Sequence, residues 1–157
     1  MAGKTSSIPF RIRLADWQAD REALAQIRVQ VFIREQGVPT ELELDGRDDA
    51  AVHALAVDEQ GKPVGTARLL PEGQVGRMAV LPGYRGQGIG SALLGRLIEE
   101  ALRQGCGRLF LNAQVQVQGL YRRFGFRPVG DIFMEAGIPH QRMERALPAS
   151  ASSPPRD

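Results

Sequence analysis

The chain has 157 residues, 43% of them hydrophobic, a length that allows one substantial hydrophobic core. Its formal net charge is +2 and its basic residues are scattered, which argues against a nucleic-acid-binding protein. The sequence shows neither a membrane-spanning apolar run nor a secretory core, so we expect a cytoplasmic protein that does not bind membranes. Cys106 is the only cysteine, which excludes an intramolecular disulfide and a cysteine metal cluster.

The beginning of the chain predicts a strand followed by a helix. Residues 10–14 alternate apolar and polar side chains, as a half-buried strand does, and Asp16 is a suitable cap for the helix. Apolar residues then recur at intervals of three and four, as on one face of an amphipathic helix: Leu24, Ile27, Val31 and Phe32. The pattern stops near residues 37–39, where a glycine and a proline favour a turn.

Residues 41–49 form an acidic segment without a clear apolar period. The segment has five carboxylates, opposed only by Arg47, and such local charge can attract a cationic amine. A solvated loop is the simpler interpretation, because most charged loops have no further role. The acidic residues do not follow the spacing of a calcium-binding loop, and we predict no metal site.

The middle and the end of the chain predict strands and helices separated by clear turn sequences. Three antiparallel strands are expected at residues 52–57, 64–70 and 74–81. A helix is expected from Ile89 to Gln104, because seven apolar residues share one of its faces. The remaining elements are a strand at 108–113, a helix at 115–124 and strands at 126–134 and 141–146.

These elements predict a single α/β domain with a mixed, mostly antiparallel sheet flanked by helices. The domain is expected to cover residues 10–147, after a flexible N-terminus at residues 1–9. Residues 148–157 are rich in proline and serine and are expected to be disordered.

The turn at residues 85–90 is the segment that best indicates a function. Gly86, Gly88 and Gly90 allow the backbone to bend tightly and to bring its N–H groups close to an anion. The helix that follows adds unpaired N–H groups and a partial positive charge at its first turn, and Arg85 adds a full charge. This arrangement is suited to a pyrophosphate.

Two better-known glycine motifs do not fit this turn. A Walker loop needs a lysine after its last glycine, and the only lysines of the chain are Lys4 and Lys62. A dinucleotide-binding motif follows the first strand of a long alternating series of strands and helices. Here the turn lies in the middle of the chain, with too little sequence beyond it.

Two motifs resemble those of the GNAT superfamily of N-acetyltransferases. Arg85, Gly88 and Gly90 match its acyl-CoA signature, Arg/Gln-x-x-Gly-x-Gly/Ala, and residues 121–126 look like its Tyr-x-x-x-Gly-Phe element. The segments at 31–39 and 135–140 resemble the ElaA-like branch. The resemblance covers residues 10–147 and implies the GNAT acyl-CoA N-acyltransferase fold.

The resemblance also implies that acetyl-CoA is a cosubstrate and indicates where it binds. The expected cofactor-binding residues lie on one strand, in the turn and after the next strand: Met78, Ala79, Val80, Arg85, Gly86, Gln87, Gly88, Ile89, Gly90, Ser91 and Asn112. The N–H groups of Ala79 and Val80 are candidates to bind the thioester carbonyl. Pairing with a neighbouring strand would occupy them unless a bulge or splay frees them. Gln114 and Gln116 are secondary candidates.

The implied reaction is direct attack of a primary amine on the thioester through a tetrahedral intermediate. Tyr121 is the candidate proton donor to the thiolate, because a phenol with a pKa of about 10 is protonated at neutral pH. The amine needs a base, and four residues are chemically capable: Glu35, Glu135, His53 and His140. Glu135 and His140 flank a short predicted turn and are expected to meet across it, and Glu35 is an equal rival.

The sequence leaves the acceptor and one alternative function open. A polyamine, an amino sugar, an amino acid and a protein amine all remain candidate acceptors. The alternative is a non-catalytic module that binds acyl-CoA without a working base. Family analogy also allows a homodimer, although no interface can be located from the sequence.

Overall fold

The computed structural model of the protein describes residues 8–148, except for the side chains of residues 41 and 42. The expected flexible N-terminus and disordered tail therefore lie outside the described residues, apart from residues 8, 9 and 148. Among the described residues, no helix combines the length and the apolar character that a membrane crossing needs.

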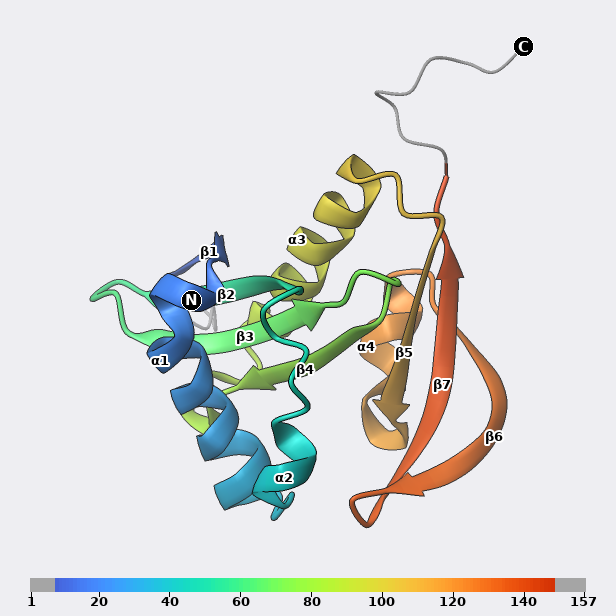
Figure 1. The fold of residues 1–157 in the computed structure, drawn as a ribbon, viewed down its shortest axis with the longest axis horizontal. Coiled ribbons are helices and arrows are strands. Elements are labelled where there is room, and N and C mark those ends of the chain that lie inside the picture. The colour runs from blue at the N-terminus through green and yellow to red at the C-terminus, as the bar shows by residue number, and fades with distance from the viewer. Residues whose placement is uncertain (1–7, 149–157) are drawn as a thin grey trace, which may run out of the picture.

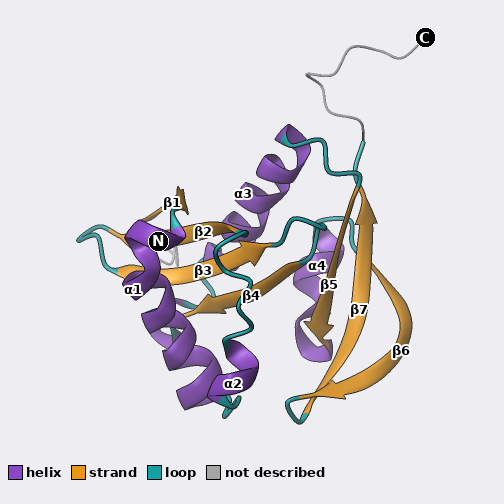
Figure 2. Ribbon diagram, in the orientation of Figure 1, coloured by secondary structure: helices purple, strands orange, loops and turns teal. Residues whose placement is uncertain are grey.

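Seven strands and four α-helices form the described domain (Figures 1 and 2). In chain order the elements are β1 (Phe10–Ala15), α1 (Trp17–Arg28), the π-helix η1 (Val29–Glu35), α2 (Thr40–Glu43), β2 (Val52–Asp58), β3 (Pro63–Leu69), β4 (Val75–Val80), the 3₁₀-helix η2 (Pro82–Tyr84), α3 (Ile89–Arg103), β5 (Arg108–Gln114), the 3₁₀-helix η3 (Val115–Val117), α4 (Gln118–Arg123), β6 (Arg127–Glu135) and β7 (Ile138–Ala146).

The strands form two sheets instead of one continuous sheet. The first has the order β1-β2-β3-β4 and the second has the order β5-β7-β6, with antiparallel pairing throughout both. A single parallel bridge, between Gln74 and Phe110, joins them. The predicted mixed, mostly antiparallel architecture is confirmed, and the two sheets diverge beyond this bridge.

Helices α1 and α3 cover opposite faces of the first sheet (Figure 1). The alternation of side chains along β2 explains this, because Ala54 and Ala56 pack with α3 whereas Leu55 packs with α1. The apolar face predicted for residues 89–102 is confirmed, since Leu93, Leu94 and Leu97 are fully buried.

Gly73 lies where the two sheets meet. The backbone N–H of Phe110 donates to the Gly73 carbonyl at 3.0 Å, and Gly73 has a φ of +102°. A Cβ added there would lie 2.4 Å from the carbonyl oxygen of Arg108, which is closer than real side chains approach. Only glycine fits this position.

Three local predictions differ from the structure. The first helix does not stay α-helical to its end but continues as the π-helix η1, with Gln36 N–H bonded to the Val31 carbonyl five residues earlier. The Asp16 side chain makes no capping bond, and instead the Asp20 carboxylate accepts from the Asp16 N–H at 2.9 Å. His140, predicted to follow a turn, lies inside β7, because the hairpin turn is confined to residues 136–137.

Candidate functional site

A cleft of about 1050 Å³ opens where β4 and β5 separate. Its walls come from η1, β4, the glycine turn, β5, α4 and the β6–β7 hairpin. The predicted cofactor-binding and catalytic residues line it, apart from His53 and Gln87, and the side-chain oxygen of Gln87 instead accepts from the Ile8 N–H at 3.1 Å. The fold thus brings together residues that lie more than 100 positions apart in the sequence, from Glu35 to His140.

A β-bulge in β4 shapes one wall of the cleft. Thr66 pairs with Ala79 and Arg68 pairs with Gly76, so residues 77 and 78 together face the single residue Ala67. Arg77 adopts a φ of +50°, which is uncommon for a residue with a side chain. The sequence left open whether a bulge or a splay frees backbone groups of this strand, and the structure contains both.

The backbone of β4 alternates between its neighbour β3 and the cleft. The N–H of Leu81 donates to the Val64 carbonyl at 2.9 Å, so the antiparallel ladder turns the Ala79 amide toward β3 and the Val80 amide toward the open edge. Of the two amides proposed for the thioester carbonyl, Val80 is therefore the one that faces the cleft.

The glycine turn has the geometry that its sequence predicts. Gly86 and Gly88 adopt φ values of +75° and +85°, and Gly88 is the N-cap of α3 without any side-chain cap. A Cβ added at Gly88 would meet no atom within 4 Å, so the space in front of the helix is open. The first N–H groups of α3 are thus available to an anion in the cleft.

Arg85 and Glu35 contact each other at the edge of this turn. The two Nη atoms of Arg85 lie 2.7 Å from the two carboxylate oxygens of Glu35, and Nε of Arg85 donates to the Val80 carbonyl at 2.8 Å. The guanidinium of Arg85 lowers the pKa of Glu35 by hydrogen bonding, which keeps this carboxylate ionised.

Tyr121 is buried in the cleft wall. Its side chain is 8% exposed, its hydroxyl lies 3.9 Å from Sδ of Met78, and its ring meets Phe126 edge to face. Burial raises the pKa of Tyr121 to about 12, so the phenol keeps its proton at neutral pH.

Glu135 and His140 meet across the β6–β7 hairpin. Nδ1 of His140 lies 2.7 Å from the Ile138 carbonyl and therefore carries the proton, while Nε2 lies 3.7 Å from Oε2 of Glu135. Phe133 stacks on the imidazole with a centroid distance of 6.0 Å. Nε2 consequently faces Glu135 and the cleft.

His53, the other histidine considered as a base, does not line the cleft. It is 1% exposed in β2, stacks on Trp17, and holds Nε2 2.9 Å from the Asp48 carbonyl. Burial lowers the pKa of His53, which keeps the ring neutral. His53 belongs to the packing of the fold.

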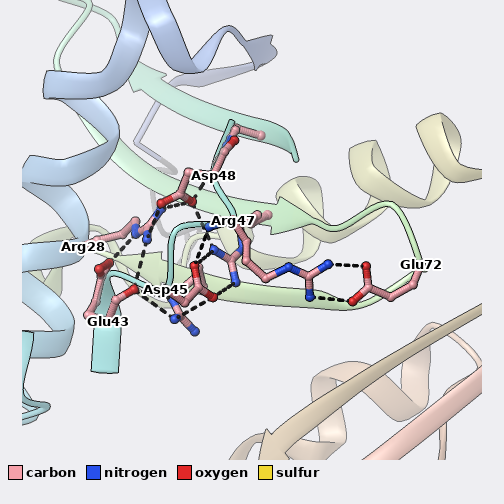
Figure 3. Close-up of polar contacts among 9 residues, drawn as sticks. Arg28, Glu43, Asp45, Arg47, Asp48 and Glu72 are labelled. Atoms are coloured by element: carbon pink, nitrogen blue, oxygen red, sulfur yellow. Dashed lines mark hydrogen bonds and ion pairs between the residues drawn. The ribbon is translucent and has the colours of Figure 1, made fainter. Parts of the chain in front are cut away.

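Arginine side chains pair with three carboxylates of the acidic segment, Glu43, Asp45 and Asp48 (Figure 3). Arg28 pairs with Glu43 and, at 2.8 Å, with Asp48, while Arg68 pairs with Asp45 at 2.8 Å. Asp48 also accepts from Arg68 at 3.1 Å, Arg77 donates to the Glu43 carbonyl at 2.9 Å, and Arg47 pairs with Glu72 at 2.6 Å. Hydrogen bonding to Arg68 holds the pKa of Asp45 well below its usual range. This segment connects α1, β3 and β4 through ion pairs and hydrogen bonds. It is therefore not the freely solvated loop that the sequence favoured.

Some cleft residues were not predicted from the sequence. They are Phe32, Gln36, Val38, Arg77 and Arg123. Gln36 and Val38 follow the π-helix, whose extra residue per turn changes the direction of the chain. Gly37 and Pro39 predicted a turn there but gave no indication of the π-geometry that precedes it. For Arg123, the sequence did contain a signal, because two basic residues, Arg122 and Arg123, stand together at the end of α4.

Comparison with known proteins identifies the family. A family model described as an acetyltransferase (GNAT) domain matches residues 19–147. The uncharacterized N-acetyltransferase YjcF of Bacillus subtilis is 35% identical over 121 residues, which cover 74% of this chain and 86% of YjcF. The crystal structure of an acyl-CoA N-acyltransferase from Pseudomonas aeruginosa is 32% identical, with a TM-score of 0.78 and coverage of 87% of this chain and 99% of that chain. The crystal structure of Escherichia coli ElaA is 30% identical, with a TM-score of 0.78 and coverage of 86% of this chain and 99% of that chain. The chain belongs to the GNAT acetyltransferase family.

Proposed function

We propose that this protein is an acetyl-CoA-dependent N-acetyltransferase that moves an acetyl group to a primary amine by direct attack. The observation that carries the proposal is one cleft that combines an anion-binding turn, an open strand edge and the buried phenol of Tyr121. The family implies use of an acyl-CoA.

The described residues fit such a cosubstrate. The uncapped start of α3 and the glycines before it offer N–H groups to a pyrophosphate. The Val80 amide offers a hydrogen bond on the open edge of β4, where no neighbouring strand competes for it. Asn112 lines the opposite wall from β5 and supplies a side-chain amide. Bound acetyl-CoA supplies an activated thioester.

Two groups of the chain would stabilise the transfer. The Val80 N–H donates to the carbonyl oxygen as negative charge builds there. Tyr121 donates its proton to the leaving thiolate, and its raised pKa of about 12 keeps that proton in place until then. Met78, 3.9 Å away, places the hydroxyl at the β4 wall of the cleft.

We assign the base to His140, with Glu135 beside its accepting nitrogen. The Ile138 carbonyl fixes the proton on Nδ1, which leaves Nε2 able to accept the proton of the amine. Glu35 is the poorer base, because Arg85 holds both of its oxygens and lowers its pKa.

Calorimetric titration of acetyl-CoA and free CoA tests the cofactor site. A tryptophan at Gly88 should fill the open space before α3 and abolish binding, while the protein stays folded. Gly105→Trp is the matched control, because Gly105 has a similar φ of +77°, also faces open space and lies at the other end of α3. The site is supported if the wild type and Gly105→Trp bind the two ligands and Gly88→Trp does not.

Release of CoA in the presence of an amine panel tests the reaction. Turnover that requires both acetyl-CoA and the amine supports a transferase. Cofactor binding without any turnover would favour the non-catalytic acyl-CoA-binding module, and the absence of cofactor binding by the wild type would overturn both readings.

A further inference from the structure

The carboxylates of the cleft are unequal in what they offer to a cationic acceptor. Four of them line the described cleft: Glu35, Glu43, Asp45 and Glu135. Arg85 balances Glu35, Arg28 balances Glu43, and Arg68 balances Asp45. Among residues 8–148 the Glu135 side chain has no arginine partner, is 54% exposed and has the imidazole of His140 as its one ion-pair partner. The cleft therefore presents one uncompensated carboxylate, next to the proposed base.

Uncharged amide side chains continue the wall from this pair. Gln114 is the cross-strand partner of His140, and its side-chain amide donates to Gln36 at 3.4 Å. Gln116 in turn donates to Gln114 at 3.3 Å. These bonds are long, so a ligand can replace them at little cost. The three glutamines span the opening between η1 and β5, beside Glu135 and His140.

Glutamine amides recognise a particular kind of chemical group. Each amide has two N–H donors and one carbonyl acceptor, which matches a hydroxyl or an amide. A second ammonium would need a second uncompensated carboxylate, and near this wall the described cleft offers only Glu135.

We propose that the acceptor is an amine with a single positive charge and neighbouring hydroxyl or amide groups, and that Gln36, Gln114 and Gln116 recognise those neutral groups. The inference rests on the proposed transferase function and narrows it. Among the acceptor classes that the sequence left open it selects amino sugars and excludes polyamines, and it adds amino alcohols and amino acid amides as further candidates.

Three amines with the same four-carbon chain test this selectivity: butylamine, 4-aminobutan-1-ol and 1,4-diaminobutane. The measurement is kcat/KM at saturating acetyl-CoA, with glucosamine as a hydroxyl-rich fourth amine. One hydrogen bond to a neutral group changes kcat/KM by about threefold to tenfold. We expect 4-aminobutan-1-ol to exceed butylamine by that factor and 1,4-diaminobutane to be the poorest of the three.

The Gln114→Met and Gln116→Met variants identify the residues responsible. Each should reduce the advantage of 4-aminobutan-1-ol over butylamine to about twofold or less. Gln116 is exposed after β5, so its variant stays informative if a change at half-buried Gln114 impairs folding. Gln118→Met is the matched control, because Gln118 bonds to Gln141 at 2.8 Å and does not line the cleft.

The outcomes separate this inference from the proposed function. Preferred turnover of 1,4-diaminobutane, or equal losses for butylamine and 4-aminobutan-1-ol in both glutamine variants, would overturn the acceptor class while the transferase function stands. Binding of acetyl-CoA without turnover of any of the four amines would also count against the acceptor class. Failure of the wild type to bind acetyl-CoA would overturn the transferase function itself.

Discussion

Arg85 and Glu35 form a two-bond ion pair that connects the glycine turn to the end of the π-helix. Each Nη of Arg85 lies 2.7 Å from one oxygen of Glu35, and Nε of the same guanidinium holds the Val80 carbonyl. One side chain thus joins η1, the turn and β4. Two residues proposed from the sequence for separate tasks, phosphate binding and proton abstraction, are partners of each other.

This pairing predicts different consequences for the two rival bases. Glu35→Gln should leave kcat within about threefold of the wild type, because Arg85 already occupies that carboxylate. His140→Gln should lower kcat by about 100-fold, the usual contribution of a general base. Steady-state kcat at saturating concentrations of both substrates makes the comparison. A loss for Glu35→Gln as large as that for His140→Gln would assign the base to Glu35.

Removal of the Tyr121 hydroxyl should impair the transfer and not cofactor binding. Tyr121→Phe keeps the ring contact with Phe126, so the fold and the KM for acetyl-CoA should be preserved, while kcat falls by about 100-fold. Tyr84→Phe is the control, since Tyr84 also lines the cleft but its hydroxyl donates at 3.1 Å to Asp58, which does not. Equal kcat values for the two variants would remove Tyr121 from the reaction.

His53 should make the stability depend on pH in the weakly acidic range. Burial lowers the pKa of His53 in the folded state, so the unfolded chain binds a proton that the folded chain does not. The contribution of the neutral His53 ring to stability is therefore complete above the unfolded pKa of about 6.5. As the pH falls below that value, the free energy of unfolding decreases by at most about 1.4 kcal/mol per pH unit.

Urea unfolding at pH 7.5, 6.5 and 5.5 measures this dependence. The His53→Asn variant should lose most of the change between these pH values, whatever its overall stability. A slope equal to that of the wild type in this variant would mean that another group is responsible.

Arg28 should be far more important for stability than an exposed arginine with a similar partner. Arg28 is 2% exposed, and its removal leaves buried Glu43 without its arginine partner and buried Asp48 with Arg68 alone. We expect Arg28→Leu to lower the free energy of unfolding by about 3–5 kcal/mol. Arg13→Leu breaks the ion pair with Asp20, in which the Arg13 side chain is 52% exposed. This change should lower the free energy of unfolding by less than about 1 kcal/mol. Urea denaturation of both variants tests the contrast, and equal losses would contradict it.

The parts of the fold that depend on local sequence were predictable. The glycines at positions 86 and 88 indicate positive φ values, because few other residues tolerate them. The apolar spacing from Ile89 onward predicts the buried face of α3. The meeting of Glu135 and His140 followed from a short hairpin between them. In each case the deciding residues lie within about one or two turns of one another.

The features that shape the cleft depend on residues far apart in the chain. Arg77 takes a positive φ that no local preference predicts, while its side chain bonds to the Glu43 carbonyl, 34 residues away. The arginines that neutralise the acidic segment come from α1 and β3, so the segment looked like a free negative patch. The spacing of Leu24, Ile27 and Val31 is compatible with both α- and π-geometry at the end of the first helix. The π-helix η1 could therefore not be predicted from it.

The absent side chain of Gly73 lets the two sheets approach closely at the bridge beyond which β4 and β5 separate. The two sheets meet at the Gln74–Phe110 bridge. Gly73 lies beside this bridge, with no room for a methyl group before the Arg108 carbonyl. Any larger residue at position 73 would force the Arg108 carbonyl to shift, which would change how the two sheets meet. The separation of Val80 on one sheet from Asn112 on the other therefore depends on a residue that does not itself line the cleft.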